Sequence, residues 1–177
     1  LSGAGVVIGN AIEECKILAE RLDAPVCNGY QHNDSFPGSH PLAVGPLGYN
    51  GSKAAMQLIS KADVVLALGT RLNPFSTLPG YGIDYWPKNA TIIQVDMNPD
   101  RIGLTKKVTV GICGDCKMVA KQISEKLSTD AGNNGREERK NLIHKTKSAW
   151  LQTLTGLDHE EDDPGTVWNK EARERDK

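Results

Sequence analysis

The sequence predicts an α/β fold, a doubly wound parallel sheet followed by an additional helical segment at the carboxyl end. From the first residue to about residue 127, short apolar runs alternate with amphipathic stretches, a pattern typical of strands that alternate with helices. The run ADVVLALGT at 62–70 is apolar on both faces, as a central parallel strand covered on both sides should be. Helices that connect parallel strands in this way lie on both faces of the sheet.

The expected strands lie at 24–28, 62–70, 91–96 and 108–112, where the sequence reads APVCN, ADVVLALGT, TIIQVD and VTVGI. The third ends at Asp96, and Asn98 can then cap a short helix whose first position suits Pro99. The opening residues, LSGAG, reach a glycine turn before a whole strand could have formed. We therefore expect a domain that is truncated at its amino end.

Three helices are expected in the sheet region, each with a suitable residue at its amino end. Asn10 caps the first, with Glu13 three residues later as in a capping box, while Ser52 and Asp115 cap the second and third. Each helix buries one stripe of residues against the sheet. The stripes are Ala11, Cys15, Leu18, Ala19 and Leu22; Ala55, Leu58, Ile59 and Ala62; and Cys116, Val119, Ala120, Ile123 and Leu127.

Two long connections, residues 28–51 and 70–90, are rich in glycine, proline and aromatic residues. Loops of this length in a compact domain are usually functional or disordered, and the aromatic content argues against disorder. Both follow expected strands, so we expect both to gather at the carboxyl edge of the sheet, beside Asp96.

Beyond residue 127 the character of the sequence changes. Residues 1–127 form the expected domain, residues 128–140 have the small and polar composition of a linker, and residues 141–177 begin with an amphipathic helical pattern around Trp150. One interpretation is that 141–177 leads towards a further, cofactor-binding domain at the carboxyl end. The alternative is a peripheral helix that packs back on the sheet.

Composition excludes several classes of protein. The formal net charge is −1, which lacks the basic excess of a nucleic-acid-binding protein. The apolar stretches are too short to span a membrane, and no leader pattern opens the sequence, so we expect a cytoplasmic protein. The four cysteines do not form a secreted disulfide framework. The pair in CGDC, Cys113 and Cys116, has the spacing of a dithiol or half a zinc site, but without a second ligand pair we expect a structural role.

Four residues at strand ends are candidates for a nucleotide pocket. Gly3 and Gly5 lie in a glycine turn, Arg71 follows a central strand, and Asp96 ends another. The turn could cradle a phosphate, the guanidinium could pair with it, and the carboxylate could accept both hydroxyls of a ribose. The structural alternatives are that the small residues only permit tight packing and that the acid only supports its turn.

The runs FPGSHPLAVGPLGYNG (36–51), ADVVLALGTRLN (62–73) and IIQVDMNPDRIG (92–103) resemble a known family. The chain resembles the Rossmann-like central domain of thiamine-diphosphate-dependent enzymes of the acetolactate synthase and pyruvate oxidase group. The resemblance covers most of residues 1–127. Residues 29–56 and 73–88 are most similar to members that convert sulfoacetaldehyde and phosphate into acetyl phosphate and sulfite.

The resemblance implies an oligomer of identical three-domain subunits that uses thiamine diphosphate and Mg²⁺, both bound by domains outside this sequence. The activating glutamate of the first domain and the Gly-Asp-Gly motif of the third are missing here, since CGDC lacks the second glycine. We therefore expect no catalytic residue, no metal ligand and no activity in this chain alone. Arg71 and Asp96 match family positions that face a nucleotide.

Flavin-binding relatives carry Met-His-Gly at the end of the first long loop and an acidic pair after the arginine. Here the corresponding stretches are 49–51, Tyr-Asn-Gly, and 73–75, Asn-Pro-Phe, which argues against FAD. Two alternatives remain open: the central domain of an FAD-containing acetolactate-synthase-like enzyme, and a nucleotide-binding module without catalytic activity.

Overall fold

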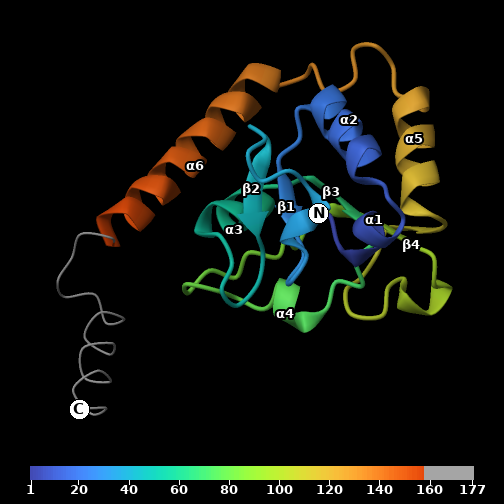
Figure 1. The fold of residues 1–177 in the computed structure, drawn as a ribbon, viewed down its shortest axis with the longest axis horizontal. Helices are drawn as coiled ribbons and strands as arrows, with labels where there is room; N and C mark the ends of the chain where they lie inside the picture. The colour runs from blue at the N-terminus through green and yellow to red at the C-terminus, as the bar shows by residue number, and fades with distance from the viewer. Residues whose placement is uncertain (158–177) are drawn as a thin grey trace.

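The computed structural model describes residues 1–157, and it confirms the predicted α/β class. Its strands are β1 (Val26–Asn28), β2 (Ala43–Pro46), β3 (Val64–Leu68), β4 (Thr91–Asp96) and β5 (Val110–Cys113). The pairs β1–β2, β3–β4 and β4–β5 are all parallel, and helices lie on both sides of the strands (Figure 1).

The first three residues join the two halves of the sheet. Ser2 bridges Asn28 of β1 and Leu68 of β3, in parallel on both sides. Its N–H donates to the Cys27 carbonyl at 2.9 Å, and the Gly3 N–H donates to the Leu68 carbonyl at 3.0 Å. Figure 1 accordingly places the amino terminus between β1 and β3. The strand order is thus β2, β1, the amino-terminal segment, β3, β4 and β5.

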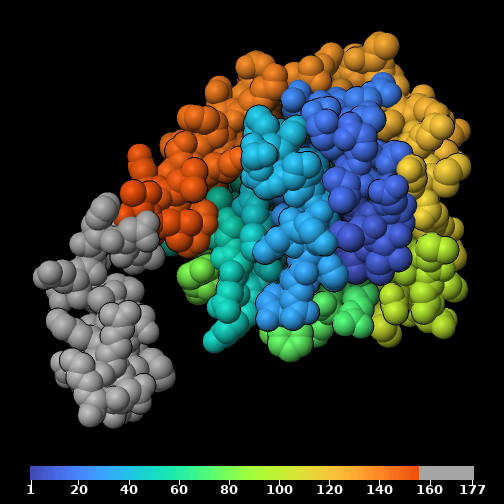
Figure 2. Space-filling view, in the orientation of Figure 1, coloured from blue at the N-terminus to red at the C-terminus, as the bar shows by residue number. Residues whose placement is uncertain are grey.

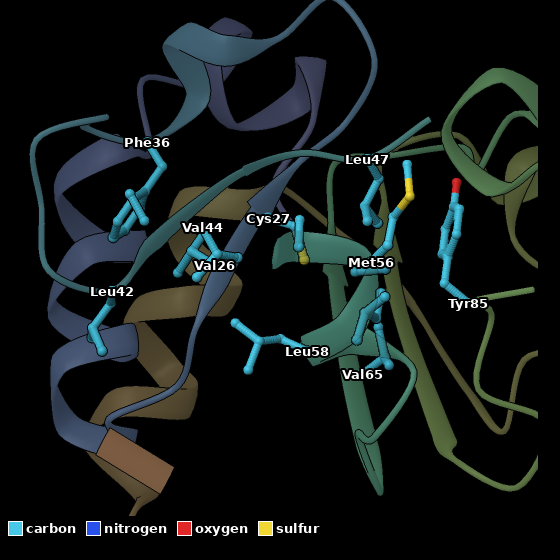
Figure 3. Close-up of a cluster of buried hydrophobic side chains, with 14 of the residues drawn as sticks. Val26, Cys27, Phe36, Leu42, Val44, Leu47, Met56, Leu58, Val65 and Tyr85 are labelled. Atoms are coloured by element: carbon cyan, nitrogen blue, oxygen red, sulfur yellow. The ribbon is translucent and has the colours of Figure 1, made fainter. Parts of the chain in front are cut away.

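The helices pack in two groups, one on each face of the sheet. The helices α1 (Ala4–Ile8), α2 (Ile12–Leu22) and α5 (Cys116–Lys126) share one core with Leu68 and Val95. On the other face α3 (Lys53–Ile59) packs on β1 and β3. Figure 3 shows this second core, with Val26 and Cys27 of β1, Leu58 of α3 and Val65 of β3.

Three of the predicted helix caps are confirmed. The side chain of Ser52 accepts from the Ala55 N–H, that of Asp115 from the Met118 N–H, and that of Asn98 from the Asp100 N–H at the start of the 3₁₀ turn Pro99–Arg101.

The predicted cap at Asn10 is wrong, because Ala11 occupies that position and no side chain caps α2. Asn10 adopts a left-handed conformation with φ 49°, and its N–H donates to the Val7 carbonyl at 3.0 Å. Asparagine tolerates this conformation better than most residues. Asn10 therefore closes the short helix α1 instead of starting α2.

The sequence analysis also missed β2, which lies inside the connection 28–51. Its residues, AVGP, include a glycine and a proline, which normally argue against a strand. Since β2 pairs only with β1 among the described residues, it is an edge strand, where a proline removes no ladder bond that the sheet needs. The same connection contains the 3₁₀ turn Asn33–Ser35, and the second connection contains α4 (Pro74–Thr77).

The last described helix is α6 (Arg136–Leu157), which begins inside the stretch expected to be a linker. Its start is fixed by Arg139, whose guanidinium donates to the carbonyls of Leu22 and Asp23 at the end of α2. Ile143 is buried against α3, and Trp150 meets Tyr81 edge to face at 5.8 Å. Figure 2 shows α6, in orange, lying along the body of the domain. The rest of the expected tail, 158–177, lies outside the described residues.

Across residues 1–157, no helix combines the length and the hydropathy that a membrane span requires.

Candidate functional site

The two long connections meet at the carboxyl edge of the sheet, as predicted. The rings of Tyr30 and Phe75 stack with centroids 5.6 Å apart. The Tyr30 N–H donates to Ser76 Oγ at 2.8 Å, and the buried Tyr85 hydroxyl donates to the Ser76 carbonyl at 3.0 Å. The two contacts of Tyr30 join the loops that follow β1 and β3, and the Tyr85 contact lies within the second loop. Segments far apart in the sequence thus make one ordered rim.

The glycine turn lies directly against the end of β3. The Gly5 N–H donates to the Gly69 carbonyl at 2.9 Å. A Cβ atom on Gly5 would lie 2.6 Å from the Gly69 Cα, and one on Gly3 would lie 2.7 Å from the Gly69 carbonyl oxygen. Separations this short exclude any side chain at either position. Gly3 and Gly5 are therefore required for two backbone segments to touch, independently of any ligand.

Asp96 lies at the carboxyl end of β4, as predicted, and is buried with 7% exposure. Its Oδ1 accepts the Asn98 N–H at 2.9 Å. Its backbone carbonyl accepts the Gly114 N–H at 3.1 Å, which ties the end of β4 to the residue after β5. The carboxylate thus supports the turn that starts at Asn98.

Arg71 follows β3 and is exposed. Its carbonyl accepts the Thr105 hydroxyl at 3.0 Å, and the Leu72 carbonyl accepts the same hydroxyl at 2.7 Å. Within residues 1–157 the Arg71 guanidinium has no ion pair within 4.0 Å, and Asp96 has none either. The structure therefore places Arg71 and Asp96 at adjoining strand ends without pairing them.

Gln94 joins two loops at this edge of the sheet, and the sequence analysis did not single it out. The residue is 1% exposed on β4. Its amide nitrogen donates to the carbonyls of Thr70 and Arg101 at 3.0 and 3.2 Å, and its amide oxygen accepts the Gly103 N–H at 2.9 Å. The available signal was a single polar residue inside the apolar run IIQVD. The Gln94 side chain thus joins the loop that carries Arg71 to the turn that follows Asp96.

The cysteines of CGDC differ in exposure. Cys116 is the first residue of α5 and is buried. Burial, followed by the nearby charge of Asp115, raises the pKa of its thiol to about 12. The first turn of a helix favours a thiolate, but at Cys116 desolvation outweighs the helix dipole. Cys113 is exposed, and its thiol lies 3.6 Å from the Met97 carbonyl.

Metal ligands do not cluster in the described part of the chain. Among residues 1–157 no three His, Cys, Asp or Glu side chains come together as a metal ion would require.

Comparisons with known proteins place the chain in a family. The model for the thiamine pyrophosphate enzyme central domain matches residues 1–123. A "Probable sulfoacetaldehyde acetyltransferase" of Rhizobium meliloti (strain 1021) is 77% identical over 176 residues, which is 99% of this chain and 30% of the relative. The sulfoacetaldehyde acetyltransferase of Roseovarius nubinhibens is 73% identical, over 98% of this chain and 29% of its own length.

More distant matches agree. A "Probable acetolactate synthase large subunit" of Methanocaldococcus jannaschii is 38% identical over 89% of this chain and 24% of the relative. A solved structure of an enzyme assigned as thiamin diphosphate-dependent, from Mycobacterium smegmatis, has a TM-score of 0.57 and 28% identity. It matches 72% of this chain and 24% of that one. The chain spans about 30% of the length of these two curated acetyltransferase relatives. By the family model and these identities, the chain belongs to the thiamine pyrophosphate enzyme family, in which it corresponds to the central domain.

Proposed function

We propose that this chain is the central domain of a sulfoacetaldehyde acetyltransferase. The whole enzyme would convert sulfoacetaldehyde and phosphate into acetyl phosphate and sulfite, with thiamine diphosphate as cofactor. The observation that carries the proposal is the 77% identity over 99% of the chain to a relative with that name, against 38% to an acetolactate synthase subunit. The matched 176 residues include both connections at the carboxyl edge.

The cofactor fits other parts of the proposed enzyme better than this chain. The Gly-Asp-Gly motif that holds the diphosphate and Mg²⁺ in the family is missing from this sequence, where CGDC at 113–116 lacks the second glycine. The cofactor, when bound, supplies the carbanion chemistry of the reaction. The proposed role of this chain is to hold the rim formed by 28–51 and 70–90 in a fixed arrangement for the neighbouring domains. Residues 128–140 would then connect to 141–177, which would lead towards the domain that binds the cofactor.

The proposal is tested with the whole purified protein, supplied with thiamine diphosphate, Mg²⁺, sulfoacetaldehyde and phosphate. We expect sulfite and acetyl phosphate in a one-to-one ratio, and neither product when phosphate is omitted. Residues 1–177 alone should form neither. Release of carbon dioxide and acetolactate from pyruvate, without sulfite from sulfoacetaldehyde, would instead assign the acetolactate-synthase-like function, and a yellow protein would support bound FAD.

We further propose that Gly3, Gly5, Arg71 and Asp96 form a pocket of the nucleotide-binding type that now has a structural role. Two observations favour this. Asp96 uses its carboxylate on the Asn98 N–H, and the two glycines are required by the contact with Gly69. The stretches 49–51 and 73–75, which differ from those of flavin-binding relatives, argue against FAD, so Mg²⁺ and thiamine diphosphate are the cofactors that we propose.

Asp96→Ala tests this structural role. Asp96→Ala removes the charged acceptor of the part-buried hydrogen bond that the Asn98 N–H donates, which should lower the free energy of unfolding by about 1–2 kcal/mol. We expect the same loss with and without FAD or ADP, measured by urea unfolding of the chain. Asp100→Ala, at an exposed position in the same turn, serves as the matched control and should change little. Saturable binding of either nucleotide in calorimetric titration of the whole protein, lost in Asp96→Ala, would show that the pocket is functional.

The whole enzyme is also proposed to be a homo-oligomer. Large apolar side chains are exposed on the loops of the carboxyl edge, including Tyr49, Phe75, Leu78 and Tyr81, where contact with other domains or subunits would cover them.

A further inference from the structure

The helix α6 touches both long connections, 28–51 and 70–90. It starts beside the end of α2 and runs past α3 (Figure 1). Several of its side chains contact the rest of the domain, among them Arg136, Arg139, Ile143, Lys147 and Trp150. These positions are three or four residues apart, so the contacts lie on one face of the helix.

Lys147 holds the first connection. Its ammonium group donates to the Pro41 carbonyl at 2.8 Å and to the His40 carbonyl at 3.4 Å, just before β2 begins. Partial burial lowers the pKa of the Lys147 ammonium below its usual value, which shows that these two carbonyls replace part of its water. The imidazole of His40 lies 3.0 Å from Glu20 of α2. The segment that leads into β2 is therefore held from both α2 and α6.

Trp150 holds the second connection. Its ring meets the ring of Tyr81 edge to face, with centroids 5.8 Å apart, and the Tyr81 hydroxyl donates to the Gly51 carbonyl at 3.1 Å. Gly51 ends the first connection, so one tyrosine joins α6 to both connections. The backbone of Tyr81 has φ of 51°, a conformation that is unfavourable for tyrosine and persists only where surrounding contacts hold it.

The attachment of α6 to the domain is mainly polar. Ile143 is the only buried residue among residues 136–155, and Arg139 donates to two backbone carbonyls at the end of α2. A cavity of about 640 Å³ remains between α6, the end of α2 and residues 40–42. A segment that buries few apolar groups opens at a lower free-energy cost than the domain as a whole.

We propose that α6 is a strap that docks on the domain and detaches from it as one unit, and that docking keeps the two connections in order. Gly132 and Gly135, with φ of 78° and 63°, precede the helix and give it a pivot. Detachment would release Tyr81 and the segment before β2 together. The consequence for the whole enzyme rests on the role of the rim proposed above, because a neighbouring domain that holds α6 would thereby hold the rim.

Amide exchange of the whole purified protein, followed by mass spectrometry of its peptides, tests the strap. In the unchanged protein, peptides of α6 should exchange at least about tenfold faster than those of β4, because α6 opens without global unfolding. Ile143→Asp puts a charge into the buried contact with α3. It should release α6 and also speed exchange by about tenfold at 39–43, 48–52 and 79–84. Leu151→Asp, at a position of α6 that is 57% exposed, is the matched control and should leave all three segments unchanged.

Milder substitutions decide the matter if Ile143→Asp unfolds the domain, which faster exchange in β4 would reveal. Lys147→Met should speed exchange at 39–43 alone, because it removes the donor to the carbonyls there. Lys145→Met, at an exposed position of the same helix, is its control. Trp150→Ala should act at 79–84 and 48–52 alone, through Tyr81.

Two results would overturn the proposal. One is an α6 that exchanges no faster than β4 in the unchanged protein. The other is a pair of connections that keep their protection when α6 is released or when its two contacts are removed. Neither measurement requires turnover, so a protein that makes no acetyl phosphate can still confirm the strap. An active acetyltransferase whose connections do not respond to α6 would contradict the strap alone.

Discussion

Replacing Gly69 with alanine is expected to destabilise the domain by about 3–5 kcal/mol, a large part of the total stability of a domain of this size. A Cβ atom at this position would lie 2.5 Å from the Gly5 Cα and 2.8 Å from the Val6 nitrogen. Both neighbours are backbone atoms, so no change of rotamer can relieve the overlap. The glycine turn and the end of β3 would have to separate, and the hydrogen bond between Gly5 and Gly69 would be lost with them.

Gly103→Ala is the matched control for this prediction. Gly69 and Gly103 both have left-handed backbones, with φ of 57° and 74°, but a Cβ atom on Gly103 would meet nothing within 4 Å. Gly103→Ala should therefore cost only the left-handed backbone penalty of about 1–2 kcal/mol. Urea unfolding followed by circular dichroism measures both variants. Equal losses would contradict the argument, because they would mean that the close approach of Gly5 and Gly69 contributes nothing.

Features encoded by neighbouring residues could be predicted from the sequence. Ser52, Asn98 and Asp115 act on amides two or three residues ahead, so their roles are visible in a short window. The sequence around Asn10 predicts a helix cap equally well, but Asn10 follows α1 directly and adopts a left-handed conformation there, so it cannot cap α2. The strand β2 was missed for a related reason, since proline is tolerated only because β2 lies at the edge of the sheet, and that position depends on the whole topology.

For the candidate site too, the positions of single residues could be predicted from the sequence, but the contacts between distant segments could not. The sequence placed Arg71 and Asp96 at strand ends because each follows an apolar run, and it placed Gly3 and Gly5 in a glycine turn. It could not show that Gly5 touches Gly69, or that the Thr105 hydroxyl reaches the carbonyl of Arg71. Those contacts join segments 34 or more residues apart, and no periodicity records them. Only the resemblance to a known family indicated that these distant segments lie together, because a family likeness extends over the whole fold and not over a short window.

Gln94 joins the loop that carries Arg71 to the turn after Asp96, and this is the basis of the second prediction with a large effect. Its three hydrogen bonds reach the carbonyls of Thr70 and Arg101 and the N–H of Gly103, all within 3.2 Å. Water has little access to a side chain that is 1% exposed. Removing the amide would leave backbone groups of both loops without partners, which costs more than the hydrogen bonds themselves contribute.

Gln94→Met is therefore expected to lower the free energy of unfolding by about 2–4 kcal/mol. Methionine is unbranched and close to glutamine in length, so the loss would come from the missing polar contacts and not from a cavity. Gln57→Met is the control, because Gln57 is exposed on α3 and the change should stay within about 0.5 kcal/mol.

Amide exchange gives the local measurement. In Gln94→Met the Gly103 amide loses its acceptor and should exchange faster, while the Gly5 amide, bonded to the Gly69 carbonyl, should exchange no faster than global unfolding requires. A Gly103 amide that keeps its protection in a destabilised Gln94→Met chain would show that packing, and not the side-chain amide of Gln94, fixes the turn after Asp96.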